Sequence, residues 1–307
     1  YSKSAIEKAR AEGKKVSYIA PEDVITKSGA EMFRLWAAST EFRNDIPYSQ
    51  QLLDGLADWY RKYRNTARFL LGSLADFDPN QHHRGAAGVE LRAIDRYLLD
   101  RLDALLPRVR EAYDRYELHV VHRALVEFVT VDVSALYGDV AKDRLYCDAA
   151  NSADRRAAQY VLYQALRAVV TLAAPIMAFT CEDIWTHLPK RAGDPASVHM
   201  AMFEARVGGK PASTHKAAIV EDFAVLLRYR HAVTEALEPF RAAKHKSADA
   251  HVTVTATAAD RELLARYLPE LAEFFIVSAV TLADEVAAEP AVSVAQHAGH
   301  KCDRCWR

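Results

Sequence analysis

The sequence predicts a mainly α-helical protein, with a helix bundle over about residues 50–190 followed by a small α/β unit. Apolar residues recur at steps of three and four through several long segments, which is the spacing of amphipathic helices. Glycine and proline are scarce, at 11 each in 307 residues, which favours helices over a turn-rich β architecture. After about residue 217 the pattern changes, and short alternating stretches typical of strands appear.

The composition narrows the classes of function. A chain of 307 residues is expected to form one large domain or two to three smaller ones. The formal net charge is −1, whereas nucleic-acid-binding proteins are often strongly basic, so such a function must depend on a local stripe of cations. No apolar run of about 18 residues occurs, so no membrane span is expected, and no signal peptide is visible. Four cysteines favour thiols in a reducing compartment over a disulfide framework.

The first segment, residues 1–20, is polar and basic and predicts a loop or a short helix. Pro21 followed by Glu22 and Asp23 predicts a helix start, because proline suits the first turn and acidic residues suit the positive end of the helix dipole. Gly29 is expected to end that helix, and a second helix is expected to follow it.

The segment 49–71 has a strong helical period and carries a stripe of arginines. Its apolar positions recur at steps of three and four: Leu52, Leu56, Trp59, Tyr63, Ala67 and Leu70. Arg61, Arg64 and Arg68 follow the same rhythm, about 120° around the helix from the apolar stripe. These arginines, with Asn65 beside them, could hold a phosphodiester backbone, since guanidinium groups fork onto phosphate oxygens. A solvated helix face is the alternative that the residues leave open.

Helical periodicity returns after residues 76–88, a stretch whose Asp, Pro, Asn and Gly content predicts a loop. Three further helical segments are expected, over about 94–109, 121–136 and 153–173. Thr180 with Asp183 resembles a capping box, which predicts the start of one more short helix. Long helices joined by short loops are typical of antiparallel neighbours in a bundle.

A loop-rich stretch at 190–217 separates the bundle from the second unit. That unit is predicted to contain, in order, a helix over about 219–243, a strand at "HVTVTAT", a helix over about 259–274, a strand at "FFIVSAVTLA" and a third strand at "AVSVAQ". Because helices and strands alternate, we expect a small α/β fold that is separate from the bundle.

Cys302 and Cys305 in "KCDRCWR" form the strongest metal-binding pattern in the sequence. Two intervening residues let both thiolates turn onto one ion, but structural zinc sites have four ligands, so this pair supplies two of them. His297 and His300 precede the pair, so a local four-ligand site is the alternative to half of a zinc knuckle.

The histidines and cysteines of the bundle favour ordinary structural positions. Surface or core-edge positions are expected for His82, His83, His119 and His122. Cys147 and Cys181 are expected to be buried as small apolar side chains in bundle helices.

Taken in chain order, several stretches resemble one family: "GAEMFRLWAASTEFRNDIPYS", "WYRKYRNTARFLLGSLADFDP", "DVSALYGDVAKDRLYCD", "LAAPIMAFTCEDIWTHLP" with "SVHMAMF", and "KCDRCWR". The chain resembles the C-terminal part of a bacterial-type isoleucyl-tRNA synthetase, a class I aminoacyl-tRNA ligase. The resemblance covers essentially all 307 residues. It implies that the chain is the tRNA-binding portion of an enzyme that attaches isoleucine to its tRNA using ATP.

The resemblance also implies roles for segments of the chain. The expected divisions are 1–48, the end of a catalytic core; 49–190, a helical anticodon-binding domain; 191–218, a linker; 219–290, a small α/β junction domain; and 291–307, an incomplete zinc knuckle. The bundle is expected to dock the anticodon stem and loop of isoleucine tRNA. The phosphate-contacting region is expected to comprise Arg61, Lys62, Arg64, Asn65 and Arg68.

"YSKS" at the start of the chain resembles the end of the family's Lys-Met-Ser-Lys-Ser loop, which closes over ATP. Ser2, Lys3 and Ser4 match its last three positions, Tyr1 stands where methionine is usual, and "AIEKARAEGKKVSY" replaces the usual short turn. Lys3 is therefore expected to stabilise ATP phosphates in the parent enzyme, which uses magnesium. The nucleotide-binding fold is absent from this sequence, so the chain alone is expected to be inactive.

The remaining expectations concern partners and location. Cys302 and Cys305 are expected to be zinc ligands in the parent enzyme, with tRNA as the partner, no membrane contact, a monomeric state and a cytoplasmic location. A valine- or leucine-specific relative is one alternative, although the "KCDRCW" ending favours isoleucine. Alternatives from other classes are a non-enzymatic helical RNA- or protein-binding module and an independent zinc-binding domain.

Overall fold

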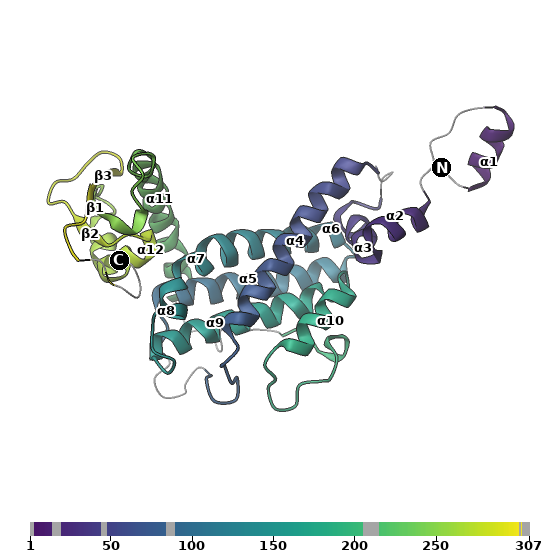
Figure 1. Ribbon diagram of the computed structural model, residues 1–307, viewed down its shortest axis with the longest axis horizontal. Coiled ribbons are helices and arrows are strands. Elements are labelled where there is room, and N and C mark those ends of the chain that lie inside the picture. Colours follow the sequence, from purple (N-terminus) through teal and green to yellow (C-terminus); the bar gives the residue numbers. More distant parts are fainter. Residues whose placement is uncertain are drawn as a thin grey trace.

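The computed structural model describes residues 3–13, 20–43, 48–83, 90–204, 215–300 and 302, and it confirms the mainly helical fold class. Figure 1 shows three parts along the long axis, with short N-terminal helices at one end, a helix bundle in the middle and a small α/β unit at the other end. Within these ranges, no helix combines the length and the apolar character that a membrane crossing requires.

The N-terminal part contains three short helices, α1 (Lys3–Ala11), α2 (Pro21–Ser28) and α3 (Ala30–Ser39). Pro21 occupies the first turn of α2 as predicted. Gly29 ends α2 with a φ of 88°, a value that glycine adopts without a steric clash. Helix α3 packs against the bundle helices α4 and α6.

The bundle contains α4 (Gln50–Ser73), α5 (Ala93–Asp114), α6 (Leu118–Glu127), the π-helix η1 (Phe128–Tyr137), α7 (Gly138–Val140), α8 (Lys142–Tyr146), α9 (Ala153–Ala173) and α10 (Ala178–His187). Ser49 caps α4 by accepting a hydrogen bond from the Leu52 N–H at 3.2 Å. The predicted apolar stripe of α4 is buried except for Leu52, which is half-buried. Helix α9 lies in the centre and packs against α4, α5 and α10, so the predicted bundle is confirmed.

The segment predicted as one helix over about 121–136 changes its winding. Helix α6 continues directly into η1, which is ten residues long. Gly138 ends this segment at a close approach, since a Cβ there would lie 3.0 Å from the Val133 carbonyl oxygen and 3.4 Å from the Phe69 ring. Apolar periodicity identifies a helix here, but most residues of η1 are apolar, so the pattern does not distinguish its π winding.

The second unit contains α11 (His215–Ala242), β1 (Ala250–Thr255), α12 (Arg261–Phe275), β2 (Ala279–Leu282) and β3 (Ala291–Gln296), with the short 3₁₀ turn η3 (Ser247–Asp249). Another 3₁₀ turn, η2 (Val198–Met200), packs against α9 and α10 of the bundle. The sheet order is β2-β1-β3, with β1 parallel to β2 and antiparallel to β3. Helix α12 is the crossover that the parallel pair requires.

One detail of this unit differs from the sequence expectation. The strand predicted at "FFIVSAVTLA" is wrong in its first half, because Phe274 and Phe275 form the last turn of α12 and bury their rings in the core. Ile276 then ends the helix in a left-handed conformation, with a φ of 60°. Strand β3 pairs with β1 along its whole length, so the third strand predicted at "AVSVAQ" is confirmed as part of the sheet.

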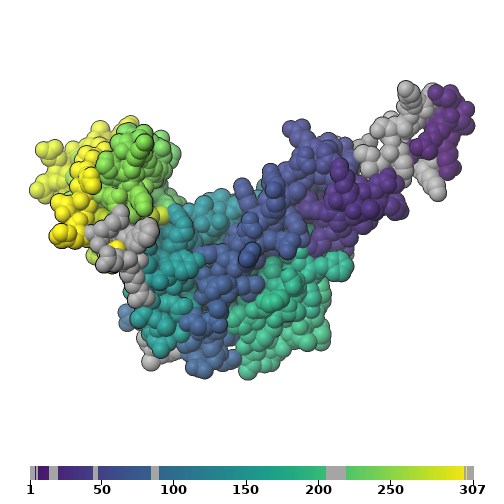
Figure 2. Space-filling view, viewed as in Figure 1, coloured from purple at the N-terminus to yellow at the C-terminus, as the bar shows by residue number. Residues whose placement is uncertain are grey.

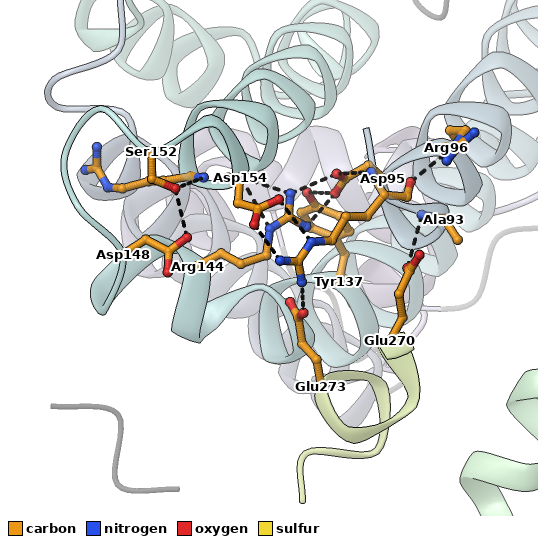
Figure 3. A network of polar contacts seen from close by, with 12 residues as sticks. Ala93, Asp95, Arg96, Tyr137, Arg144, Asp148, Ser152, Asp154, Glu270 and Glu273 are labelled. Atoms are coloured by element: carbon orange, nitrogen blue, oxygen red, sulfur yellow. Dashed lines mark hydrogen bonds and ion pairs between the residues drawn. The ribbon is translucent and has the colours of Figure 1, made fainter. Parts of the chain in front are cut away.

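A buried ion pair lies where α5, α8 and η1 meet, as Figure 3 shows. Arg144 donates to both oxygens of Asp95 at 2.9 and 2.8 Å, and the two side chains are 3% and 0% exposed. Tyr137 donates to the same carboxylate at 2.6 Å. Asp95 lies in the first turn of α5, where the helix dipole favours negative charge. Each of these charges is stabilised in the interior by its partner.

Arg92 extends this network to the α/β unit through Glu273 of α12. It donates to Asp154 at 3.1 and 2.6 Å and also to Glu273 of α12. Glu270 of α12 accepts a hydrogen bond from the Ala93 N–H at 3.2 Å. Helix α12 is therefore joined by polar contacts to the start of α5 and, through Arg92, to the start of α9.

Candidate nucleic-acid interface

A groove of about 390 Å³ lies between α4 and α10. Figure 2 shows these helices on one face of the molecule, α4 in blue and α10 in green. The α4 wall carries Arg61, Arg64, Asn65 and Arg68, and the α10 wall carries Thr180, Asp183 and His187. We call this feature the arginine groove.

The sequence of α4 explains why its arginines line the groove. The apolar stripe packs against α9 and η1, so the residues about 120° away remain at the surface beside α10. All four polar residues of the α4 wall are exposed. Of the five predicted contact residues, Lys62 alone lies outside the groove lining, and it is exposed on α4.

A polar cluster fixes one end of the arginine groove. Glu31 of α3 accepts hydrogen bonds from the backbone N–H groups of Phe179 and Thr180, at 2.7 and 2.8 Å. Tyr60 of α4 donates to Glu31 at 3.1 Å and bonds the Thr180 hydroxyl at 2.7 Å. Helices α3, α4 and α10 are thus held in one arrangement by these contacts.

The same cluster corrects the predicted capping box. Helix α10 begins at Ala178, and the Thr180 hydroxyl donates to Glu31 rather than capping its own helix. The acceptor for the first N–H groups of α10 comes from a residue almost 150 positions away, which local spacing cannot indicate. A carboxylate at this end of a helix is also favoured by the helix dipole.

The three arginines of the groove differ in whether a carboxylate pairs with them. Arg61 forms an ion pair with Asp58 one turn earlier. In the ranges given above, neither Arg64 nor Arg68 has a carboxylate partner, although the Arg64 guanidinium lies 5.8 Å from the centre of the Tyr60 ring. Two guanidinium groups in a surface groove are therefore available to an anion, and phosphate is the anion that suits their fork of donors.

The opposite wall was not predictable from the spacing of residues in the sequence. Thr180, Asp183 and His187 are more than 100 positions from α4 in the sequence, and no spacing rule connects them to the arginine stripe. The His187 ring and the Asp183 carboxylate lie 3.8 Å apart, so this wall supplies a carboxylate and no permanent cation. The groove's cationic character comes from α4.

The structure places the predicted ATP-loop residues at the N-terminal end. Lys3 is the first residue of α1 and Ser4 is exposed, whereas Ser2 lies outside the described residues. The short-helix alternative for residues 1–20 is confirmed for residues 3–11.

For the predicted metal ligands, Cys302 is described and exposed, and Cys305 lies outside the described residues. His297 packs edge-on to His251, with ring centres 5.9 Å apart. The described residues contain no group of three or more potential metal ligands. The described part thus holds no complete four-ligand site around Cys302.

The histidines of the bundle occupy structural positions, as predicted. His122 packs edge-on to Trp59 at 4.9 Å, and burial lowers its pKa from 6.5 to about 4. The His119 imidazole lies 3.5 Å from Glu41. The His82 Nδ1 accepts a hydrogen bond from the Asp78 N–H at 3.0 Å, while His83 is exposed.

One of the two cysteine expectations is confirmed. Cys181 on α10 is fully buried, and burial raises the pKa of its thiol to about 12. The expectation for Cys147 is wrong, because it follows the end of α8 and is only half-buried.

Comparison with known proteins gives the family. Residues 95–256 match the model described as the anticodon-binding domain of tRNA ligase. This range includes the α10 wall of the arginine groove and excludes α4, which packs in the same bundle.

Curated relatives match the chain at greater length. It is 41% identical over 310 aligned residues to the isoleucine–tRNA ligase of Syntrophotalea carbinolica, with 96% of this chain and 33% of the relative covered. It is 40% identical to that of Geobacter sulfurreducens, with 94% and 31% covered, and 37% identical to that of Geobacillus kaustophilus, with 96% and 33% covered. The chain spans about a third of the length of these relatives. Because the family model matches more than half of its residues, the chain belongs to the anticodon-binding domains of tRNA ligases.

Proposed function

We propose that this chain binds the anticodon arm of a tRNA through the arginine groove, as part of an isoleucine–tRNA ligase. The observation that carries the proposal is the pair of exposed arginines, Arg64 and Arg68, that line a groove and have no carboxylate partner among the described residues. The family match and the isoleucine–tRNA ligases that resemble the chain support the choice of tRNA and of isoleucine.

The groove residues divide by role in this proposal. Arg64 and Arg68 bind phosphate oxygens, and Asn65 between them donates to phosphate or sugar. Arg61 contributes less, because the anion must compete with Asp58. Lys62 lies outside the groove and adds a longer-range attraction to the RNA.

The test compares a charge-reversed groove with a matched control. Arg64→Glu/Arg68→Glu is expected to weaken binding to isoleucine tRNA at least tenfold at about 0.1 M salt, because the pair changes from attracting to repelling phosphate. Filter binding or fluorescence anisotropy with the whole chain measures the effect.

The control is Arg96→Glu/Arg123→Glu, which makes the same charge change at exposed helix positions outside the groove. It is expected to change affinity less than threefold. Equal losses in the two double variants would mean that only net charge matters, which contradicts a specific groove. An unrelated tRNA tests selectivity, since phosphate contacts alone do not read sequence.

The wider enzyme functions are part of the same proposal. Lys3, with Ser2 and Ser4, contacts ATP phosphates in the parent enzyme, whose reaction uses ATP and magnesium. Cys302 and Cys305 supply two of the four ligands of a zinc knuckle. We propose that the protein acts in the cytoplasm as a monomer.

A further inference from the structure

Helix α3 contacts the start of α10 at two points. The Arg34 guanidinium donates to the carbonyl oxygens of Pro175 at 2.6 Å and Ile176 at 2.9 Å, in the turn before α10. The Glu31 carboxylate accepts from two backbone N–H groups in the first turn of α10. Because residues three positions apart are neighbours on a helix surface, one face of α3 makes both contacts. Helix α3 therefore places the α10 wall of the arginine groove.

The two oxygens of Glu31 have different partners. Its Oε1 accepts both backbone N–H groups, at 2.7 and 2.8 Å, and so caps α10. Its Oε2 accepts from the Tyr60 hydroxyl of α4 at 3.1 Å and from the Thr180 hydroxyl of α10. Tyr60 and Thr180 also bond each other at 2.7 Å, and both line the arginine groove. One oxygen thus serves α10, and the other joins the two walls of the groove.

Tyr60 connects Glu31 to an arginine of the groove. The centre of the Tyr60 ring lies 5.8 Å from the Arg64 guanidinium, which is close enough for a cation–π contact. The two residues are four positions apart and share one face of α4. Because the Tyr60 hydroxyl is bonded to Glu31 and Thr180, the plane of the ring is set before an anion arrives. Arg64 therefore packs against a fixed ring, which reduces the side-chain entropy that it loses when it binds phosphate.

Glu31 itself is 9% exposed and does not line the groove, so it does not contact a ligand there. Its negative charge lies at one end of a site that we propose binds phosphate, where charge alone would weaken RNA binding. Four donors compensate for the burial of its carboxylate, namely two N–H groups and two hydroxyls. The favourable contribution of Glu31 to the groove is then the placement of Tyr60 and Thr180.

We propose that Glu31 is a positioning residue for RNA binding, which fixes Tyr60 and Thr180, and through them Arg64 and the two groove walls, before RNA arrives. This inference rests on the proposed function and adds what sets the shape of the groove. Helix α3 then takes part in RNA binding although the groove is lined by α4 and α10. A change in the position of α3 alters RNA affinity, and by linkage bound RNA stabilises α3 in its place.

Glu31→Gln tests the inference, because positioning and charge predict opposite results. The amide oxygen can keep the bonds to α10, but an NH₂ group replaces Oε2 and offers no acceptor to the two hydroxyls. Loss of a negative charge alone would strengthen RNA binding, whereas loss of positioning weakens it. We expect the affinity of the whole chain for isoleucine tRNA to fall about fivefold at about 0.1 M salt, measured by fluorescence anisotropy. Unchanged or tighter binding would overturn the inference.

Two control variants separate positioning from charge and from stability. Asp183→Asn makes the same charge change in the groove at a side chain that is 72% exposed, and is expected to strengthen binding about twofold. Asp132 is buried and accepts from Arg101 at 3.1 and 3.2 Å, outside the groove. Asp132→Asn is expected to lower stability in urea and leave affinity unchanged. A loss of affinity in either control equal to that of Glu31→Gln would contradict a positioning role.

Tyr60→Phe provides a second test, which decides the matter if Glu31→Gln fails to fold. It removes one hydroxyl and leaves the cap of α10 in place, and is expected to weaken binding about twofold. Wild-type affinity in this variant would overturn the inference.

A double-mutant cycle tests whether Glu31 acts through Arg64. Arg64→Gln is made in the wild type and in Glu31→Gln, or in Tyr60→Phe if the latter does not fold. It is expected to cost less affinity in the second background, because Arg64 is already displaced there. A merely structural role predicts additive losses, and additive losses would overturn the inference.

The results also distinguish this inference from the proposed function. If RNA binding depends on Arg64 and Arg68 but not on Glu31 or Tyr60, the positioning role is overturned and the groove proposal stands. If RNA binding does not depend on Arg64 and Arg68, the groove proposal fails and the positioning role fails with it.

Discussion

Two sets of arginines in this molecule differ in their burial and in their carboxylate partners. Arg144 is 3% exposed and donates two hydrogen bonds to Asp95. Arg64 and Arg68 are exposed on α4 and have no carboxylate partner in the described ranges. All three residues are arginines, but Arg144 joins bundle helices through Asp95, whereas Arg64 and Arg68 are available to an incoming anion.

His122 adds a third case to this comparison. It is half-buried beside Trp59, its buried Nε2 has no hydrogen-bond partner among the described residues, and desolvation lowers its pKa to about 4. A buried cation with a carboxylate partner, such as Arg144, stays charged. An exposed cation without a partner, such as Arg64, stays charged and available, whereas a basic group desolvated without a partner, such as His122, favours its neutral form. Partner and burial together therefore decide which basic residues remain charged and available to an anion.

The largest effect is expected when the buried pair is broken. Asp95→Ala leaves the Arg144 charge in the interior with no carboxylate and also removes the acceptor of the Tyr137 hydroxyl. The free energy of unfolding is expected to fall by about 3–5 kcal/mol, measured by urea denaturation.

Two further variants serve as controls for the stability loss expected of Asp95→Ala. Asp154→Asn weakens the partly exposed pair with Arg92 and is expected to cost less than about 1 kcal/mol, and Arg68→Gln less than about 0.5 kcal/mol. A cost below 1 kcal/mol for Asp95→Ala would show that burial does not distinguish the two groups of arginines.

An intermediate effect is expected from pH at His122. The folded-state pKa of about 4 lies below the ordinary 6.5, so the unfolded chain binds a proton first as pH falls. The contribution of His122 is complete above pH 6.5 and is lost as pH falls toward 4, by roughly 2 kcal/mol after allowance for partial solvent contact.

His122→Phe isolates this contribution, since it keeps an aromatic ring against Trp59 and removes the titrating group. Unfolding free energies at pH 7 and pH 4.5 are compared for the variant and the wild type, because carboxylates also titrate in this interval. The variant is expected to lose less stability between the two pH values. Parallel pH profiles would exclude His122 as an acid-sensitive group.

The fold was largely predictable from the sequence, because helix periodicity and strand alternation are local. Segment 49–71 shows this, since the stripe that it predicts is the one that α4 buries. Local patterns do not reveal which helices become neighbours. The arginines were found from α4 alone, whereas the α10 wall and Glu31 depend on contacts between distant residues.

The smallest effect on stability, and the sharpest on binding, is expected from single neutralisations in the groove. Each phosphate contact releases counterions, so the slope of log affinity against log salt falls by about 0.7–0.9 when one is lost. Arg64→Gln and Arg68→Gln are expected to show this decrease. Arg61→Gln is expected to show less, because its ion pair with Asp58 must open before a phosphate can bind. Titrations of isoleucine tRNA at several KCl concentrations measure all three slopes. If the Arg61 variant loses as much slope as the other two, a carboxylate partner on an exposed helix face does not keep an arginine from RNA. Burial, and not pairing, would then be the property that separates the two groups.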